Sequence, residues 1–308
     1  MILNINKTGM NFGKVAMAAV FLCYLAACAS ESGQEMTEES VDEGDAATEE
    51  PNAISEEVSS KIFYTIPSPL ELTSIIKKAG AKYDKSVLNS TDNISSYVTQ
   101  SGMALNLGVY GADLSYASIF EQTQETMHYF AAAKKLADDL GITSAFGEST
   151  LTRIQNNLDN KDSLVAIISD SYWETDAYLK ENKQSSISGL VVAGGWIEGM
   201  YVSTKLAEKT ENNTDVVSRI GEQKLTLDNL ISMLRGYEDP EIADLVSDLN
   251  MLKEAFEPVV ITYSRQPPTV DAESKVTTLN TTSTINITDE QLAVISEKIE
   301  GIRTKIVK

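Results

Sequence analysis

Histidine and cysteine are nearly missing from this chain of 308 residues, which has one histidine, His128, and two cysteines, Cys23 and Cys28. A single histidine excludes most histidine-based metal sites and catalytic triads, because these combine histidine with further ligands or with a nucleophile. The chain also lacks a Gly-x-Ser-x-Gly elbow, a phosphate-binding loop and a His-Glu-x-x-His motif. We therefore assign no catalytic residue, no metal site and no cofactor from the sequence.

Basic residues are scarce relative to acidic ones, with 25 Lys and Arg, 45 Asp and Glu, and a net charge of −20. Residues 1–27 contain two of the bases and residues 28–60 contain 11 of the acids, so residues 61–308 keep 23 bases and 34 acids. Such a balance disfavours binding to the phosphates of nucleic acids or to anionic lipid. We expect no nucleic-acid partner.

The beginning of the chain has the charge pattern of an export signal. Lys7 and Lys14 occur without any acid, and the apolar run VAMAAVFLCYL of eleven residues follows them. This run is too short to cross a bilayer and is typical of a secretory signal peptide. Met10 is an alternative start, because MNFGKVAMAAV is a complete signal by itself.

The apolar run ends in Leu25-Ala26-Ala27-Cys28, which resembles the lipobox of bacterial lipoproteins. The resemblance covers only the first thirty residues. It implies that residues 1–27 are a signal peptide and that Cys28 carries a diacylglycerol anchor. The mature chain would then have no disulfide, because Cys23 leaves with the signal. The alternative is a plain signal peptide with an unmodified Cys28.

The resemblance also implies a location. Ala29 follows the lipidated cysteine where an aspartate would favour retention in the inner membrane, so we expect an outer-membrane lipoprotein facing the periplasm or the cell exterior. Residues 28–60 contain 11 acids and no base, a composition typical of a disordered tether with a reach of about 30 Å. This acidic run is either a solvated spacer or similar to the surface-export signals of some Gram-negative lipoproteins.

Residues 61–308 predict an all-α fold, a single multi-helix bundle of about eight helices. Each expected helix shows apolar residues at helical spacing or a low-charge run, bounded by capping residues or glycine. The expected helical segments are Pro69–Ala79, Ile94–Phe120, Glu121–Leu140, Ser149–Leu158, Asp162–Asn182, Ser188–Lys205, Val216–Gly236, Pro240–Phe256 and Thr288–Ile306. Lys61–Ile66 is expected to be extended because Pro67 follows it.

Two of these segments, 101–118 and 188–205, are low in charge, and each begins with Ser-Gly and has a glycine six residues later. One interpretation is an internal duplication of Asn93–Leu158 by Gln184–Phe256; the other is a chance match. Gly194, Gly195 and Gly199 predict close packing of the second segment against Gly108 or Gly111 of the first, and these two glycines could instead kink the first.

The region Pro258–Thr288 interrupts the helices with paired prolines and a Thr-rich, strand-like composition. It is expected to form a hairpin or an irregular excursion. The last helix follows, with Leu292, Ile295, Ile299, Ile302 and Ile306 forming a narrow apolar seam. This seam would dock on the body or bind a partner.

The candidate ligand-binding residues are Asp113 and Glu198, each the lone acid of its low-charge segment. A buried carboxylate must be paired or hydrogen-bonded, so we weigh two alternatives: bonding to a core tyrosine or arginine, and a polar binding site between two halves. Glu125 and His128 have the spacing of a di-iron ligand pair, but such a site needs a second histidine that the chain lacks.

The function expected from these features is that of a non-enzymatic binding or assembly protein of the bacterial envelope. Its partners would be the membrane, through lipid on Cys28, and an envelope protein; the oligomeric state stays open. The alternative is an envelope hydrolase or metal-dependent enzyme that uses Asp113, Glu198 or Glu125. That alternative requires a concave pocket in which at least two acids face an open polar surface.

Overall fold

The computed structural model describes residues 66, 68–142, 148–157, 160–210, 213–237, 239–265, 269–271, 276–278 and 281–308. The expected signal peptide, the acidic tether and residues 61–65 lie outside the described residues. The helices are α2 (Pro69–Lys78), α3 (Gln100–Ile119), α4 (Thr123–Asp139), α5 (Glu148–Gln155), α6 (Lys161–Glu181), α7 (Ser185–Ala207), α8 (Thr214–Leu234), α9 (Pro240–Phe256) and α10 (Asp289–Ile306). Short 3-10 helices are η1 (Lys85–Val87) and η2 (Thr91–Ser96), and the strands are β1 (Val260–Arg265), β2 (Thr269–Asp271), β3 (Val276–Thr278) and β4 (Thr281–Asn286). The expected all-α bundle is confirmed.

Local capping explains where several helices begin and end. Ser68 caps α2, with Pro69 at the first position, and Gly80 beyond its end has a φ of 89° that favours glycine. Asp239 caps α9 ahead of Pro240. Thr288 and Gln291 form the expected capping box of α10. These contacts join residues at most three apart, so the sequence alone predicts them.

Three details of the expected helices are wrong. Helix α5 begins at Glu148, so Ser149 lies in its first turn and does not precede it. Helix α6 begins at Lys161, because the side chain of Asn160 accepts a hydrogen bond of 3.0 Å from the backbone N–H of Ser163. The expected helix Ile94–Phe120 is the end of η2 followed, from Gln100, by one continuous α-helix that Gly108 and Gly111 do not split.

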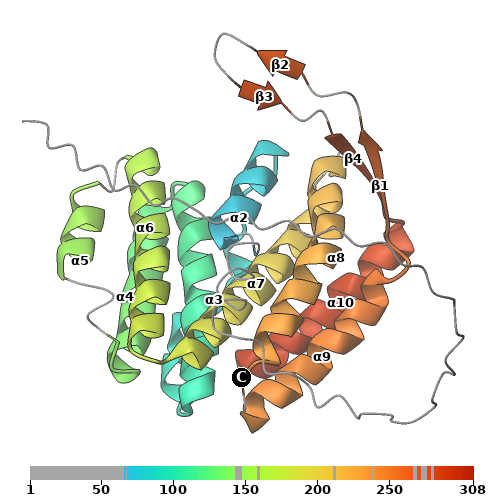
Figure 1. Ribbon diagram of the computed structural model, residues 1–308. Coiled ribbons are helices and arrows are strands. Elements are labelled where there is room, and N and C mark those ends of the chain that lie inside the picture. Colours follow the sequence, from blue (N-terminus) through green and yellow to red (C-terminus); the bar gives the residue numbers. More distant parts are fainter. Residues whose placement is uncertain are drawn as a thin grey trace, which may run out of the picture. The chain divides into compact units, whose positions relative to one another are not determined.

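Helices α3 and α7 form the centre of the bundle (Figure 1). Their backbones meet where glycine leaves room: a Cβ on Gly108 would overlap the carbonyl oxygen of Val191, and a Cβ on Gly194 would overlap that of Leu105. The predicted close packing of the two low-charge helices is therefore confirmed at Gly108. A Cβ on Gly111 would meet nothing within 4 Å.

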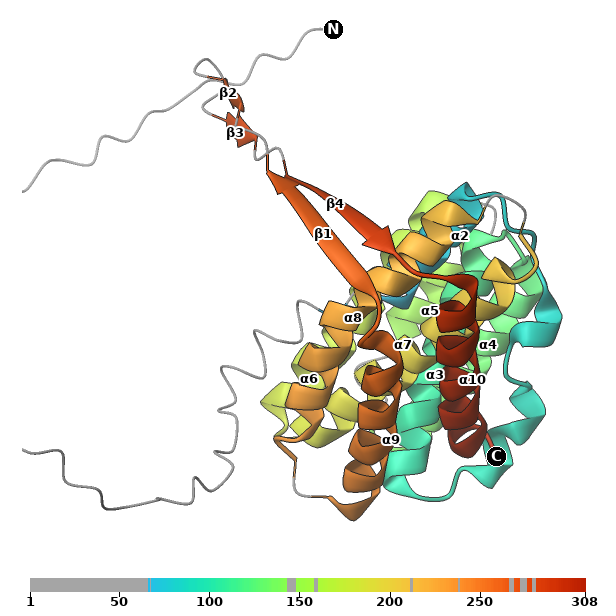
Figure 2. The ribbon, with the colours of Figure 1, turned by 90° about the vertical axis from the view of Figure 1, so that its right-hand side faces the viewer.

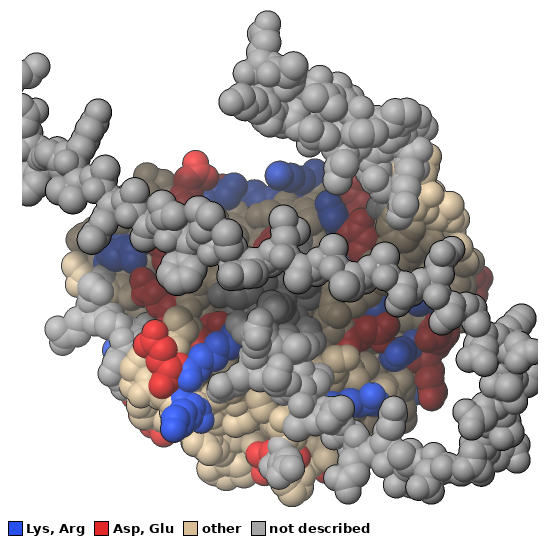
Figure 3. Space-filling model, in the orientation of Figure 1, with Lys and Arg blue, Asp and Glu red and all other residues tan. Residues whose placement is uncertain are grey.

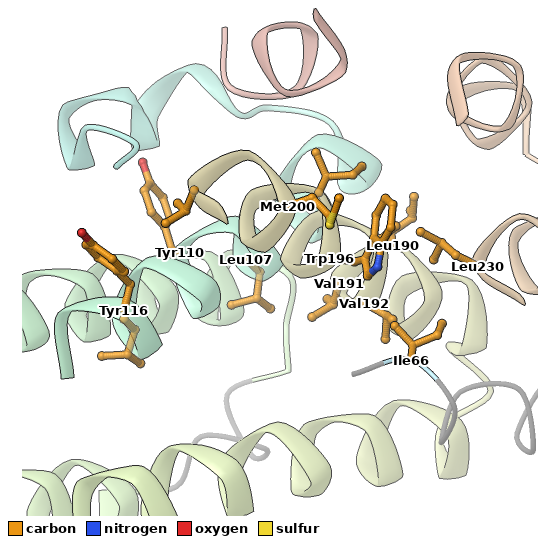
Figure 4. Close-up of a cluster of buried hydrophobic side chains, with 14 of the residues drawn as sticks. Ile66, Leu107, Tyr110, Tyr116, Leu190, Val191, Val192, Trp196, Met200 and Leu230 are labelled. Atoms are coloured by element: carbon orange, nitrogen blue, oxygen red, sulfur yellow. The ribbon is translucent and has the colours of Figure 1, made fainter. Parts of the chain in front are cut away.

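The remaining helices cover this pair on two sides. Helices α4, α5 and α6 lie on one side and α8, α9 and α10 on the other (Figure 1). Figure 4 shows Leu107 of α3 beside Val191 and Trp196 of α7 in the shared core. Trp196 is 1% exposed, whereas Trp173 is 38% exposed, so only Trp196 belongs to the core. The duplication of Asn93–Leu158 by Gln184–Phe256 stays a prediction.

The interruption before the last helix is a two-stranded antiparallel ribbon. Strand β1 pairs with β4, Val260 lying opposite Asn286, and β2 pairs with β3 beyond them. Figure 2 shows β1 and β4 running away from the helices. At the base of the ribbon, Ile285 packs where Gly221 of α8 has no side chain, and Lys224 donates to the carbonyl oxygen of Val259 at 3.1 Å.

Helix α10 docks on the body through its apolar seam. Leu292, Ile295, Ile299 and Ile302 are buried against the core. Of the two outcomes expected for this seam, docking on the body is therefore the one observed. Among the described residues, no helix is both long enough and apolar enough to cross a membrane.

Candidate functional site

The structure brings Asp113 and Glu198 together between α3 and α7. Both side chains are 0% exposed, and the two carboxyls lie close enough to interact directly. Two acids that are 85 positions apart in the chain thus form one carboxyl pair, because the glycine contact of Gly108 with α7 brings their helices close.

Arg303 of α10 neutralises this pair from the other side. Its Nε donates to Oε2 of Glu198 and its Nη2 donates to Oε1, both at 2.9 Å. The guanidinium also lies 4.4 Å from the ring centroid of Tyr201, within reach of a cation–π interaction. Such bidentate Arg–carboxylate contacts are among the strongest and most directional hydrogen bonds in proteins. Glu198 is therefore bonded to a core arginine, one of the two alternatives weighed from the sequence.

Asp113 is bonded mainly to neutral groups. Its Oδ2 accepts a hydrogen bond of 3.1 Å from the backbone N–H of Asn89. Its Oδ1 accepts none, as expected if this carboxyl is protonated and donates to Glu198. The pair therefore fits one proton shared between two carboxyls.

Burial and mutual repulsion explain this protonation. Burial raises the pKa of Asp113 well above its ordinary value, and the negative charge of Glu198 raises it further, while Arg303 opposes the shift. Burial also raises the pKa of Glu198, but here the hydrogen bonds and charge of Arg303 act against it. A carboxylic acid in a dry site stays neutral more easily than it stays charged. Of the two acids, Asp113 therefore favours the neutral form more strongly, because only Glu198 is bonded to Arg303.

The segment that contains η1 and η2 covers the pair. The backbone carbonyl oxygen of Asn89 accepts a hydrogen bond from the hydroxyl of Tyr129 at 3.0 Å. The side-chain amide of Asn89 donates to the hydroxyl of Tyr97, also at 3.0 Å. The hydroxyl of Tyr110 donates to the carbonyl oxygen of Ser90 at 2.9 Å. Burial raises the pKa of both Tyr110 and Tyr129. A layer of tyrosines and asparagine therefore separates the acids from solvent.

The end of α10 is fastened to the same segment and to α3. The carbonyl oxygen of Val307 accepts from the hydroxyl of Tyr97 at 3.4 Å, and that of Ile306 accepts from the amide of Asn106 at 2.8 Å. Arg303 also reaches the carbonyl oxygen of Val87 at 3.5 Å. The site thus joins α3, α7, α10 and residues 85–97.

Sequence reasoning found the two acids and missed most of their partners. Arg303 is one of five arginines in residues 61–308, and its charge alone does not distinguish it from the other four. Asn89 lies in a polar stretch without helical periodicity, and it contributes a backbone N–H that any residue type could supply. The signal that could have been used is the position of Arg303 directly after Ile302 on the apolar seam of α10.

The Glu125–His128 pair lies elsewhere, with Glu125 partly buried and His128 exposed. Oε1 of Glu125 bonds to Lys85 at 2.6 Å, while Nδ1 of His128, whose side chain is 53% exposed, lies 4.0 Å from Oε2. In the part of the chain that the structure describes, no group of three or more His, Cys, Asp or Glu side chains could hold a metal ion.

A small apolar cavity of about 60 Å³ lies between α3, α4 and α6. Leu107, Gly111, Phe130, Ile168 and Val191 are among its lining residues. An engineered cavity that binds benzene measures about 150 Å³, so this space suits a packing defect beside Gly111 better than a ligand site.

An open groove of about 380 Å³ lies between residues 96–102, α9 and α10. Glu241, Asp244 and Asp248 lie along its α9 wall. Asp248 bonds to Lys305 of α10 through both oxygens at 2.7 Å, and Glu241 accepts from the hydroxyl of Thr99 at 3.3 Å. Part of the acidic charge is therefore already satisfied by the protein.

Acidic and basic side chains are mixed on the described surface in Figure 3, as expected for a face that does not bind along a row of phosphates.

No family model, no curated protein and no solved structure matches this chain.

Proposed function

We propose that this protein is an outer-membrane lipoprotein, anchored through lipid on Cys28, whose helical body binds an envelope protein without catalysing a reaction. The lipobox Leu25-Ala26-Ala27-Cys28 supports the anchor. The acidic segment 28–60 would separate the membrane from the body, which would face the periplasm or the cell exterior.

The observation that carries the binding role is the ribbon formed by β1 and β4. It extends away from the helices (Figure 2), and Val260 and Tyr263 are each 54% exposed. Each of these strands pairs only with the other among the described residues, so each has an edge of backbone groups free for pairing. An isolated two-stranded ribbon is only marginally stable in water, which favours a protein partner that covers it.

The partner we propose is a protein with an extended segment or an exposed strand. Such a segment can add to a sheet edge through backbone hydrogen bonds, and side chains such as Tyr263 then give specificity. The Thr-rich sequence of β4 is typical of a strand rather than of a flexible linker.

The enzymatic alternative is less well supported by the same geometry. It requires two acids on an open polar face, whereas Asp113 and Glu198 are both fully buried. Both oxygens of Glu198 already accept hydrogen bonds from Arg303. A substrate would have to displace a buried ion pair to reach them, at a cost of several kcal/mol.

The test is site-specific photo-cross-linking in cells that produce the full chain. A photoreactive residue replaces Tyr263 in one variant and Met251, which is 45% exposed on α9, in the control. We expect a discrete adduct with one envelope protein, identified by mass spectrometry, from position 263 only. Equal adducts from both positions, or none from position 263, would contradict a partner at the ribbon.

A further inference from the structure

The buried carboxyl pair has an imbalance of charge. Two acids face one cation, Arg303, which contacts Glu198 at 2.9 Å. The other titratable groups around the pair are tyrosines, which supply no positive charge: Tyr110 on α3, Tyr129 on α4, Tyr201 on α7, and Tyr83 and Tyr97 from the covering segment. If both acids were ionised, the site would contain a net negative charge in a dry environment.

The hydrogen bonds of the four carboxyl oxygens show which oxygen can carry a proton that removes this excess negative charge. Three of the four carboxyl oxygens accept N–H donors, two from Arg303 and one from Asn89. The fourth, Oδ1 of Asp113, accepts none. One position for a proton is thus left on Asp113, and from it the carboxyl can donate to the neighbouring carboxylate of Glu198.

We propose that Asp113 and Glu198 form a single proton-binding site, and that the retained proton allows Arg303 to fasten α10 and residues 85–97 to the centre of the bundle. This inference does not depend on the anchor or on the ribbon.

Loss of the proton has a defined structural consequence. Two carboxylates in contact repel each other, and Arg303 can neutralise only one of them. The elements that depend on this neutral cluster are the end of α10, which bonds to Tyr97 and Asn106, and the segment around Asn89. Loss of the proton should therefore loosen these elements before the rest of the bundle.

The direction of the pH effect follows from proton linkage. The folded site retains a proton that an opened site, with ordinary carboxyl pKa values near 4, would release at neutral pH. The site's stabilising contribution is therefore full below the ordinary carboxyl pKa and is lost as pH rises through the folded-state pKa of the pair. Between the ordinary carboxyl pKa and the folded-state pKa, the protection of α10 amides against hydrogen exchange, corrected for intrinsic rates, should fall by up to about tenfold per pH unit.

The first experiment uses the unaltered chain. In protein labelled with ¹³C at aspartate side-chain carboxyls, titrated by NMR from about pH 4 to about pH 9, we expect one aspartate carboxyl to stay protonated at pH 7, well above the ordinary range. Ionisation of every aspartate carboxyl below about pH 5 would overturn the proposal, whatever the behaviour of any variant.

The second experiment compares Asp113→Asn with a surface control, Asp170→Asn, by hydrogen exchange; the Asp170 side chain is 55% exposed and pairs with Arg153. An asparagine at position 113 can donate to Glu198 permanently, so the pH dependence of α10 protection should disappear while protection at about pH 6 stays near that of the original protein. Asp170→Asn should keep the pH dependence. The same pH dependence in Asp113→Asn as in the original protein would show that another group controls α10.

Discussion

Arg303 and Glu198, 105 positions apart in the chain, make two parallel hydrogen bonds of 2.9 Å inside the bundle. Glu198 is 0% exposed and the Arg303 side chain is 14% exposed. A charge pair this well buried is costly to break on one side only, because the remaining ion has neither water nor a partner.

Replacing Arg303 should therefore destabilise the protein strongly. We expect Arg303→Met to lower the free energy of unfolding by about 3–5 kcal/mol, measured by urea denaturation, because it leaves the carboxylate of Glu198 unpaired. The matched control is Lys305→Met on the same helix. Lys305 pairs with Asp248 but its side chain is 63% exposed, so this change should cost at most about 1 kcal/mol. Similar losses from both variants would contradict a special role for Arg303.

Two glycines in α3 should respond to alanine with opposite signs. A methyl group on Gly108 would overlap the carbonyl oxygen of Val191, so we expect Gly108→Ala to destabilise the protein by about 1–3 kcal/mol through overpacking. Gly111 has open space, and alanine there should stabilise the helix by up to about 1 kcal/mol through helix propensity. Chemical denaturation of both variants measures this. A stabilising Gly108→Ala would show that α3 and α7 do not pack closely at this position.

Lipid attachment is tested at the two cysteines. Cys28→Ser should release the protein from membranes into the soluble periplasmic fraction without changing the circular dichroism of the body, whereas Cys23→Ser should leave it membrane-bound. Metabolic labelling with a fatty-acid analogue should mark the Cys23→Ser protein and not the Cys28→Ser protein. Retention of Cys28→Ser in the detergent phase would argue against a lipid anchor at this residue.

The two tryptophans should differ in accessibility to a fluorescence quencher. Trp196 is 1% exposed and donates to Oε1 of Gln223 at 3.0 Å, whereas Trp173 is 38% exposed. We expect acrylamide to quench Trp173→Phe protein, which retains only Trp196, several-fold less than Trp196→Phe protein. Equal quenching would place Trp196 near solvent and contradict the core around it. The Trp196→Phe variant must first show a native circular dichroism spectrum, because that change leaves a buried polar group unpaired.

The helices were predictable because their signals are local. The caps Ser68, Asp239 and Thr288 act on backbone groups two or three residues away, and the apolar spacing of α10 is visible in the sequence itself. The errors are also local: Asn160 and Asp162 are both good capping residues near the same helix start, and the sequence does not show which one makes the bond.

The candidate site was predictable only in part. A lone acid in a low-charge helix shows that Asp113 and Glu198 need partners, since burying an unpaired carboxylate is unfavourable. Which partner each acid finds depends on how α3, α7 and α10 pack, and the only local sign of that packing is that Arg303 directly follows Ile302 on the apolar seam of α10. The 3-10 turns η1 and η2 have too few residues for a periodic pattern. Their role as a cover became visible only with the hydrogen bonds of Asn89.

The long separation between Glu198 and Arg303 has a consequence for biosynthesis. As the chain leaves the ribosome, the helices that contain Asp113 and Glu198 emerge well before the arginine that neutralises them. Until then, closing α3 on α7 would bury two acids without a cation, which opposes early folding. The core formed by α3 and α7 should therefore close only after α10 has been synthesised, so that the last helix to emerge completes the centre of the bundle.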